Sequence, residues 1–216
     1  EYKLLGLMSE GLGNLNRKQK LFDAALINFR TSLQFYSKMP DSLGISFAYR
    51  NIGRVFLYNE QLDSAYYYFD KALHIADIKK YPSVSSMLLE VGVVHRSAGD
   101  YLGAESYFLS FIEQERNENN LYSGYLALGN LYLYMNRLED AKMYLALCLK
   151  SPNLVIKRDA CECLYDLEKE LDNFKGAIGY KDIADSLRII TQDIDIQNSI
   201  ATLQLSLIHI SEPTRP

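Results

Sequence analysis

Three stretches of the chain, YRNIGRVF (residues 49–56), LLEVGVVH (88–95) and YLALGNLY (125–132), share one pattern. Each begins with a large residue, places an aliphatic residue directly before a glycine, and ends with an aromatic residue or histidine. An alanine follows each glycine after twelve residues, and a bulky apolar residue follows each alanine after four. These positions are Gly53, Ala65 and Phe69, then Gly92, Ala104 and Phe108, then Gly129, Ala141 and Leu145. Self-similarity at a fixed period indicates an array of like structural units.

Two further copies extend the array. An earlier copy has Leu12, Gly13, Ala25 and Phe29, and a later, degraded copy has Leu164, Tyr165, Ala177 and Lys181. The glycine positions (13, 53, 92, 129 and 165) are separated by 40, 39, 37 and 36 residues.

Each unit is predicted to be a helix–turn–helix. The small residues allow two helices to cross closely, and apolar residues at helical spacing form the stripe that each helix buries. Clusters rich in Pro or Asn separate the units and end the helices. These clusters are KMPDS (38–42), KKYPS (79–83), RNENN (116–120) and KSPN (150–153).

The frame resembles the tetratricopeptide repeat (TPR), whose signature is W-x2-L-G-x2-Y followed by A-x3-F. Two features depart from it: the period exceeds the usual length of about 34 residues, and Tyr49, Leu88 and Tyr125 replace the tryptophan. The resemblance implies an all-α fold, an α-solenoid with a right-handed superhelix of about five repeats plus a C-terminal helix. We expect the array over residues 1–187, with units near 6–40, 46–80, 85–118, 122–153 and 158–187, and a connecting or capping helix over 188–204.

The C-terminal part carries two further resemblances. The segment YKDIADSL (180–187) is similar to the segment after the last repeat in bacterial regulators that join such arrays to a membrane helix and a cytoplasmic output domain. That resemblance implies the input part of a larger regulator, on the extracytoplasmic side, touching a membrane only through a segment outside this chain; a cytoplasmic location is the alternative. LSLIHISEPTR (205–215) resembles the translation of a sequencing adapter, so we expect residues 205–216 to be non-native and the native sequence to stop near Gln204.

Neither the composition nor the motifs indicate nucleic-acid binding, metal binding or catalysis. The net charge of −4 and the pI near 5.5 argue against a nucleic-acid binder that neutralises phosphates. Cys161 and Cys163 would point about 200° apart on a helix and cannot share a metal ion. His95 occupies a position that the repeat normally gives to tyrosine, so we interpret it as a packed residue. We therefore expect no catalytic site, no metal and no cofactor.

The resemblance also implies a binding surface, because the first helix of each repeat lines the concave face in this family. Carried over position by position, the candidate residues are Arg50, Arg54, Leu57, Tyr58, Leu89, Val93, Arg96, Leu126, Asn130, Leu133 and Tyr134. Arginines, tyrosines and aliphatic residues suit a protein or extended peptide that bears acidic groups. The alternative is an ordinary solenoid surface on which the arginines pair with neighbouring acids.

One family-specific mode of binding is not expected. Relatives that clamp a C-terminal carboxylate use lysines and asparagines at set positions of consecutive repeats. The corresponding positions here are Glu10, Asn14, Asn51, Ser86 and Glu90, where acids stand in place of bases.

A second interpretation of the whole chain is a free-standing structural or assembly adaptor that acts by self-association. The segment SAYYYFDKAL (64–73) is rich in tyrosine, and an exposed part of it would serve as a patch for a homo-oligomer.

Overall fold

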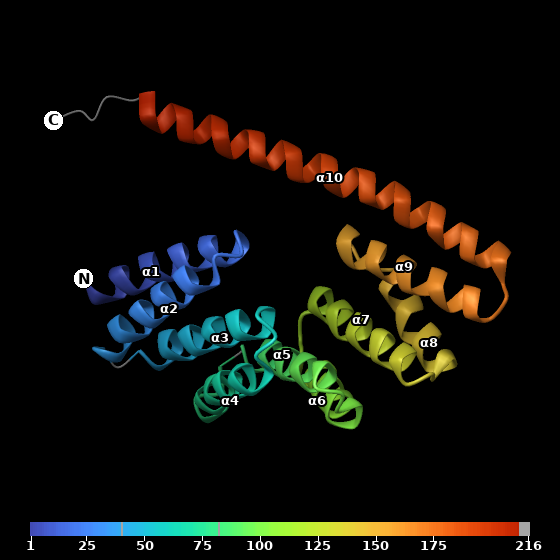
Figure 1. Cartoon of the computed structure of the whole chain (residues 1–216), viewed down its shortest axis with the longest axis horizontal. Coiled ribbons are helices and arrows are strands. Elements are labelled where there is room, and N and C mark those ends of the chain that lie inside the picture. The colour runs from blue at the N-terminus through green and yellow to red at the C-terminus, as the bar shows by residue number, and fades with distance from the viewer. Residues whose placement is uncertain (40, 82, 212–216) are drawn as a thin grey trace. The chain divides into compact units, whose positions relative to one another are not determined.

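The computed structural model describes residues 1–39, 41–81 and 83–211, and every regular element within these residues is an α-helix. The elements are α1 (Tyr2–Lys18), α2 (Phe22–Ser37), α3 (Ser42–Tyr58), α4 (Leu62–Ile78), α5 (Val84–Ser97), α6 (Tyr101–Gln114), α7 (Glu118–Tyr134), α8 (Leu138–Cys148), α9 (Leu154–Glu170) and α10 (Phe174–Ser211). Consecutive helices form antiparallel pairs (Figure 1). The chain divides into two compact units, Glu1–Asn117 with α1–α6 and Glu118–Pro216 with α7–α10, and each is described by itself.

In the first unit, the second helix of one pair packs on the first helix of the next. Ala25 and Phe29 of α2 form one buried cluster with Ile52 and Val55 of α3. The same arrangement recurs one pair later, between α4 and α5. The predicted alanine and bulky positions therefore make the core that joins one pair to the next.

The repeat glycines allow the close contact inside each pair. A Cβ at Gly92 would lie 2.4 Å from Cε1 of Phe108, whose side chain is fully buried. Gly129 of α7 bears the same relation to Leu145 of α8, with a closest distance of 2.7 Å. Any side chain at these glycines would displace the bulky residue of the partner helix, which explains why the glycine and the bulky residue occur together.

The turn inside each pair has the same backbone structure in all five pairs. Seven residues after the repeat glycine position, the chain adopts a positive φ, and the next N–H donates to the carbonyl five residues back. The positive-φ residues are Lys20, Glu60, Gly99, Asn136 and Asp172, with φ of 60°, 58°, 81°, 56° and 58°. The N–H···O distances that follow them are 2.9, 2.9, 2.9, 2.8 and 2.8 Å. This is the Schellman ending of a helix, so the degraded fifth copy has the same turn as the others.

The first helix of the array differs from the later first helices in its burial. Met8, Leu12 and Leu15 are 58%, 54% and 52% exposed. The residues 40 positions later, Ala48, Ile52 and Val55, are buried against the preceding pair. With Leu4 and Leu7, which are also more than half exposed, these residues form a solvent-facing apolar stripe along α1.

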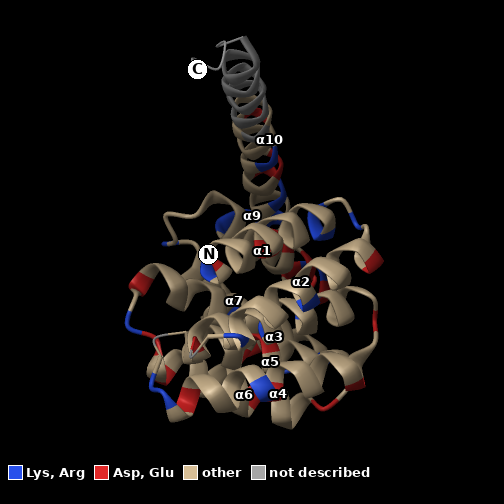
Figure 2. Cartoon of the chain, turned by 90° about the vertical axis from the view of Figure 1, so that its left-hand side faces the viewer, with Lys and Arg blue, Asp and Glu red and all other residues tan. Residues whose placement is uncertain are grey.

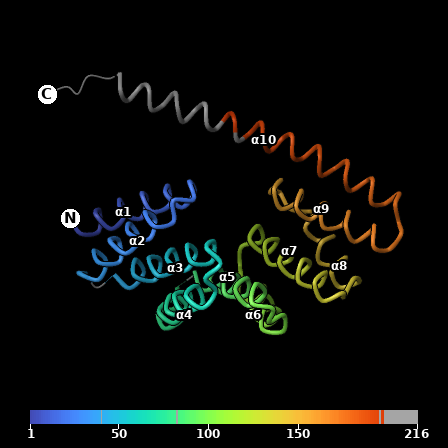
Figure 3. The backbone as a smooth tube through the Cα atoms, viewed as in Figure 1, coloured from blue at the N-terminus to red at the C-terminus, as the bar shows by residue number. Residues whose placement is uncertain are grey.

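The second unit ends in one long helix. The start of α10 runs back along α9 (Figure 3), and Ala177 and Ala184 are buried there. The helix continues without a break through the segment 188–204, for which we predicted a connecting helix. Of the predicted adapter-derived tail, residues 205–211 belong to this helix, and residues 212–216 lie outside the described residues. No described helix combines the length and apolar character required to cross a bilayer.

Candidate functional site

In the first unit, α1, α3 and α5 are joined by polar contacts between neighbouring first helices. The Asn51 amide donates to Oε1 of Glu10 at 3.0 Å, and the Tyr36 hydroxyl donates to Oε2 of Glu10 at 3.1 Å. Burial and the adjacent Glu10 carboxylate raise the pKa of Tyr36 to about 12. The tyrosine therefore remains a neutral donor throughout the physiological pH range.

A cluster of three charges links α3 to α5. Arg50 donates from Nε and Nη2 to the two oxygens of Glu90, at 2.9 and 2.8 Å, and Arg54 donates from Nε to Oε1 of Glu90 at 2.7 Å. The Arg50 and Glu90 side chains are only 16% and 14% exposed, whereas Arg54 is 31% exposed. One carboxylate thus compensates two guanidinium groups, which leaves a net charge of +1 on this part of the surface.

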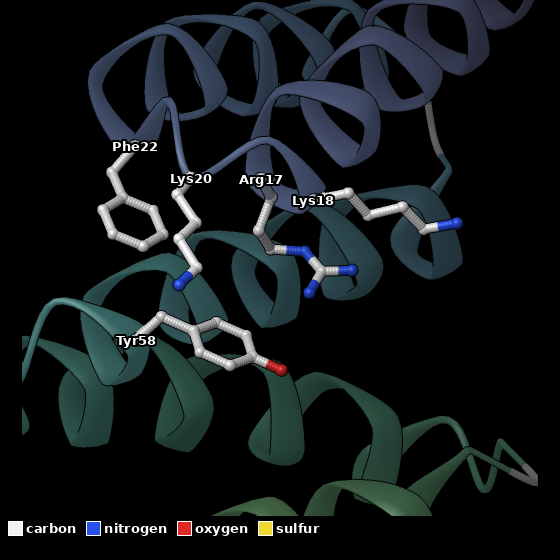
Figure 4. A pocket seen from close by; sticks show the side chains of 5 residues that line it. All are labelled: Arg17, Lys18, Lys20, Phe22 and Tyr58. Carbon is white, nitrogen blue, oxygen red and sulfur yellow. The ribbon is translucent and has the colours of Figure 1, made fainter. Parts of the chain in front are cut away.

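At the C-terminal ends of α1 and α3 lies a cavity of about 480 Å³, lined by Arg17, Lys18, Lys20, Phe22 and Tyr58 and called here the basic pocket. Figure 4 shows Arg17 and Lys20 extending from the end of α1 and the following turn toward the ring of Tyr58. The Arg17 guanidinium carbon lies 5.6 Å from the centre of that ring, within cation–π range. Tyr58 itself is 60% exposed.

A second cavity, of about 320 Å³, lies at the corresponding ends of α7 and α9 in the second unit. It is lined by Asn130, Leu133, Tyr134, Cys163, Asp166, Leu167 and Glu170, and is called here the acidic pocket. Three of these residues, Asn130, Leu133 and Tyr134, belong to the binding surface that the sequence predicted. The Cys163 thiol donates to Oδ1 of Asn130 at 2.8 Å, which joins the two first helices of this unit.

The structure gives several predicted surface residues a packing role. Leu57 packs against the core cluster between α4 and α5, while Leu126 and Leu133 pack against the cluster between α8 and α9. Leu89, Val93 and Arg96 are half-buried on α5. Arg50 and Arg54 are paired with an acid, as the alternative interpretation described. Whether any of these residues binds a ligand remains a prediction.

The basic pocket was not identified in the sequence, except for Tyr58. The sequence feature from which it could have been predicted is the segment RKQK (17–20), which has three cationic residues at a helix end and in the following turn. The repeat pattern does not include this segment, because residues 17–20 follow the glycine position of the first copy and precede its alanine position. Charges on the first unit are otherwise interspersed in sign (Figure 2).

The described histidine and cysteine side chains, which exclude that of His209, form no recognisable chemical site. Nδ1 of His95 lies 2.7 Å from Oδ2 of Asp100, whose Oδ1 accepts from the Gly103 N–H at the start of α6. His95 also packs between the rings of Tyr66 and Tyr107. Within the described residues, no group of three or more His, Cys, Asp or Glu side chains has the arrangement of a metal site.

Comparison with known proteins agrees with this geometry. Residues 4–78 match the family model described as tetratricopeptide repeat. Residues 4–78 carry tetratricopeptide repeats. Beyond residue 78, three turns with the same backbone structure, at Gly99, Asn136 and Asp172, repeat the geometry of the matched region. The contacts of Gly92 with Phe108 and of Gly129 with Leu145 repeat it as well.

Solved structures share the TPR fold. BtubC (BKLC) from P. vanneervenii superposes with a TM-score of 0.73 at 17% identity, over 87% of this chain and 82% of that chain. A kinesin-light-chain-like protein of Podosopora anserina with nearly identical TPR-like repeats gives a TM-score of 0.69 at 12% identity, over 89% and 98% of the two chains. These likenesses confirm the all-α solenoid class predicted from the sequence.

A sequence relative is the protein ycf37 of Guillardia theta, which is 27% identical over 104 residues. The match covers 48% of this chain and 55% of the relative, so the chain spans about half the length of the curated relative that it matches. TPR arrays are generally protein-interaction scaffolds and are typically non-catalytic.

Proposed function

We propose that this TPR chain is a non-catalytic scaffold that binds a protein or an extended peptide along α1, α3 and α5. The observation that carries the proposal is the row of polar side chains that are fixed by contacts between neighbouring first helices. Asn51 is held by Glu10, and Arg50 and Arg54 are held by Glu90. Side chains that are already ordered lose little further entropy when a ligand binds, which favours recognition.

Apolar side chains complete the proposed surface. Leu89 and Val93 are half-buried on α5, and Tyr58 at the end of α3 is exposed. A peptide would gain apolar contact from these residues and hydrogen bonds from the polar row. Arg54, the more exposed of the two arginines that share the Glu90 carboxylate, favours a ligand with acidic groups.

The test is a selection of random twelve-residue peptides against the intact chain, followed by fluorescence anisotropy on the enriched sequences. Val93→Glu should weaken binding at least tenfold, because it places a charge in the proposed path. Leu102→Glu is the matched control, since Leu102 lies on the second helix of the same pair and is 73% exposed. Equal weakening by both changes, or no enrichment over an unrelated helical protein, would contradict the proposal.

We also propose that the array is the input part of a larger bacterial regulator, on the extracytoplasmic side of a membrane. The support is the YKDIADSL resemblance together with the continuation of α10 beyond it as a single helix. Reading the uninterrupted gene in the source DNA tests this directly. A reading frame without a membrane span and an output domain would refute it.

Self-association is the second candidate function, and the apolar stripe of α1 favours it. Five aliphatic or Met side chains there are at least half exposed: Leu4, Leu7, Met8, Leu12 and Leu15. Tyr66 and Tyr67 of the 64–73 segment are also exposed, although Tyr66 contacts His95 and Tyr67 lies under Lys71. Sedimentation equilibrium at micromolar concentration should detect a dimer that Leu12→Asp abolishes and that Leu102→Asp, at an exposed position of α6 outside both patches, leaves intact. A monomer at all concentrations would reject this candidate.

A further inference from the structure

The basic pocket brings together three cationic side chains, those of Arg17, Lys18 and Lys20. Among the described residues, none of the side chains that line it is a carboxylate. To acceptors in the part of the chain that the structure describes, Arg17 donates one hydrogen bond, from Nη2 to Oδ1 of Asn14, and its length of 3.5 Å is long for such a bond. The Glu90 cluster is different, because there a carboxylate accepts from both arginines.

Arg17 also has a buried polar atom without a partner. Its Nε is covered by protein and has no acceptor among the described residues. A buried N–H of a charged group that lacks an acceptor is unfavourable, since the group has lost its water without gaining a hydrogen bond. Because Nε is covered, a ligand oxygen reaches the Nη atoms first and reaches Nε only after a rotation of the guanidinium.

We propose that the basic pocket binds a phosphorylated side chain of a partner peptide. A phosphoryl group carries close to two negative charges at neutral pH and three acceptor oxygens, which suit a guanidinium and two ammonium groups. A single carboxylate would neutralise only one of the three cations. Phe22 and the ring of Tyr58 form apolar walls for the carbon atoms that carry the phosphoryl group.

The proposed arrangement assigns a separate task to each cation. Arg17, whose guanidinium lies near the ring of Tyr58, presents its planar fork to two phosphoryl oxygens. Lys20 contributes a charge from the turn, where its backbone adopts the positive φ common to all five turns. Lys18 adds a third charge at the rim, where it is exposed.

The inference rests on the proposed peptide binding for the identity of the ligand, but the site can be tested without a peptide. Phenyl phosphate is titrated into the intact chain while the Nε–H signal of Arg17 is followed by ¹H–¹⁵N NMR. The signal should shift with saturation, and Arg17→Gln or Lys20→Gln should weaken binding at least fivefold. Arg30→Gln, on the exposed face of α2, is the matched control and should change nothing.

Comparison probes decide which chemistry is recognised. Benzoate should bind at least fivefold more weakly than phenyl phosphate, and equal binding would overturn the phosphoryl assignment in favour of a carboxylate. Inorganic phosphate should also bind more weakly, and equal binding would overturn the assignment to a side chain. Phenyl phosphate should bind more tightly as the pH rises from 5 to 7.5, because its second ionisation lies near 6.

The two proposals fail in distinguishable ways. If phenyl phosphate binds but no peptide is selected, the peptide-binding proposal fails and the anion site stands. If peptides bind regardless of phosphorylation and Arg17→Gln has no effect on phenyl phosphate, the inference fails and the proposed function stands.

Discussion

The basic and acidic pockets both lie near the C-terminal ends of two neighbouring first helices and have opposite charge, but Tyr58 faces charged residues of the preceding repeat and Tyr134 faces those of the following repeat. Tyr58 and Tyr134 both lie five residues after their repeat glycine, at the end of a first helix. Around Tyr58 the lining supplies Arg17, Lys18 and Lys20, whereas around Tyr134 it supplies Asp166 and Glu170.

The difference shows which residues determine the fold and which remain available for function. The contacts between small and bulky residues and the Schellman turns are the same in both repeats. The residues that carry charge lie beside these framework positions, where a change of side chain leaves the backbone unaltered. One scaffold can therefore present different chemistry at each repeat.

Breaking the framework should have the largest effect. Phe108→Ala should lower the free energy of unfolding by about 3–5 kcal/mol, because a fully buried ring is lost and a cavity is left. Urea unfolding followed by circular dichroism measures the change. Leu102→Ala on the same helix is the control and should cost less than about 0.5 kcal/mol, since this residue is 73% exposed.

The same contact can be tested from its other side. Gly92→Ala should destabilise the wild-type chain but cost less in the Phe108→Ala background, where the new methyl group has room. If the losses in unfolding free energy are additive in the double variant, contact with Phe108 is not the reason for glycine at position 92.

A buried acid of α9, Glu168, should have the next largest effect. Glu168 is 3% exposed and accepts from Lys142 Nζ at 2.7 Å and from Asn173 Nδ2 at 2.6 Å. Glu168→Gln should cost about 1–3 kcal/mol, because it removes a charge-assisted bond and leaves a polar group imperfectly paired. Glu170→Gln, whose side chain lines the pocket and is exposed, should leave the unfolding free energy nearly unchanged.

The pH dependence gives an independent check on Glu168. The hydrogen bonds from Lys142 and then Asn173 hold the pKa of its carboxyl below the ordinary value of 4.5. A carboxyl with a lowered folded-state pKa contributes stability that is complete above its unfolded-state pKa and is lost as the pH falls through the folded-state pKa. The stability difference between wild type and Glu168→Gln should therefore shrink between pH 6 and pH 3. A constant difference would mean that the charge of Glu168 contributes nothing.

Exchanging the charges of the two pockets sharpens the comparison further. If local charge alone distinguishes them, Asp166→Lys with Glu170→Lys should make the acidic pocket bind phenyl phosphate, within about tenfold of the basic pocket. NMR titration, with the signals of residues around Tyr134 as the readout, measures the affinity. A folded variant that binds no phenyl phosphate would show that a guanidinium placed as in Arg17 is required as well.

The sequence predicted the framework far better than the pockets. The glycine, alanine and bulky positions recur at fixed offsets, because each unit must solve the same packing problem. The pairing of Arg50 and Arg54 with Glu90 depends on side chains from helices about 40 residues apart. Repeat spacing alone predicts that these residues are neighbours, but it does not predict which lone pairs and N–H groups meet. The basic pocket was missed for a related reason, since Arg17 and Tyr58 approach each other only when two repeats stack.

The smallest expected effect separates a framework glycine from its neighbour on the same helix. A Cβ at Gly13 would lie 2.6 Å from Cε1 of Phe29, which is fully buried, whereas a Cβ at Gly11 would meet nothing within 4 Å. Gly11→Ala should therefore raise the free energy of unfolding by about 0.5–1 kcal/mol, which is the helix-propensity gain alone. Gly13→Ala receives the same gain but must displace the ring, so it should lower stability by about 1 kcal/mol. Urea midpoints of the two variants measure this contrast, and a shift of the same sign in both would mean that contact with Phe29 does not explain why the repeat has glycine at position 13.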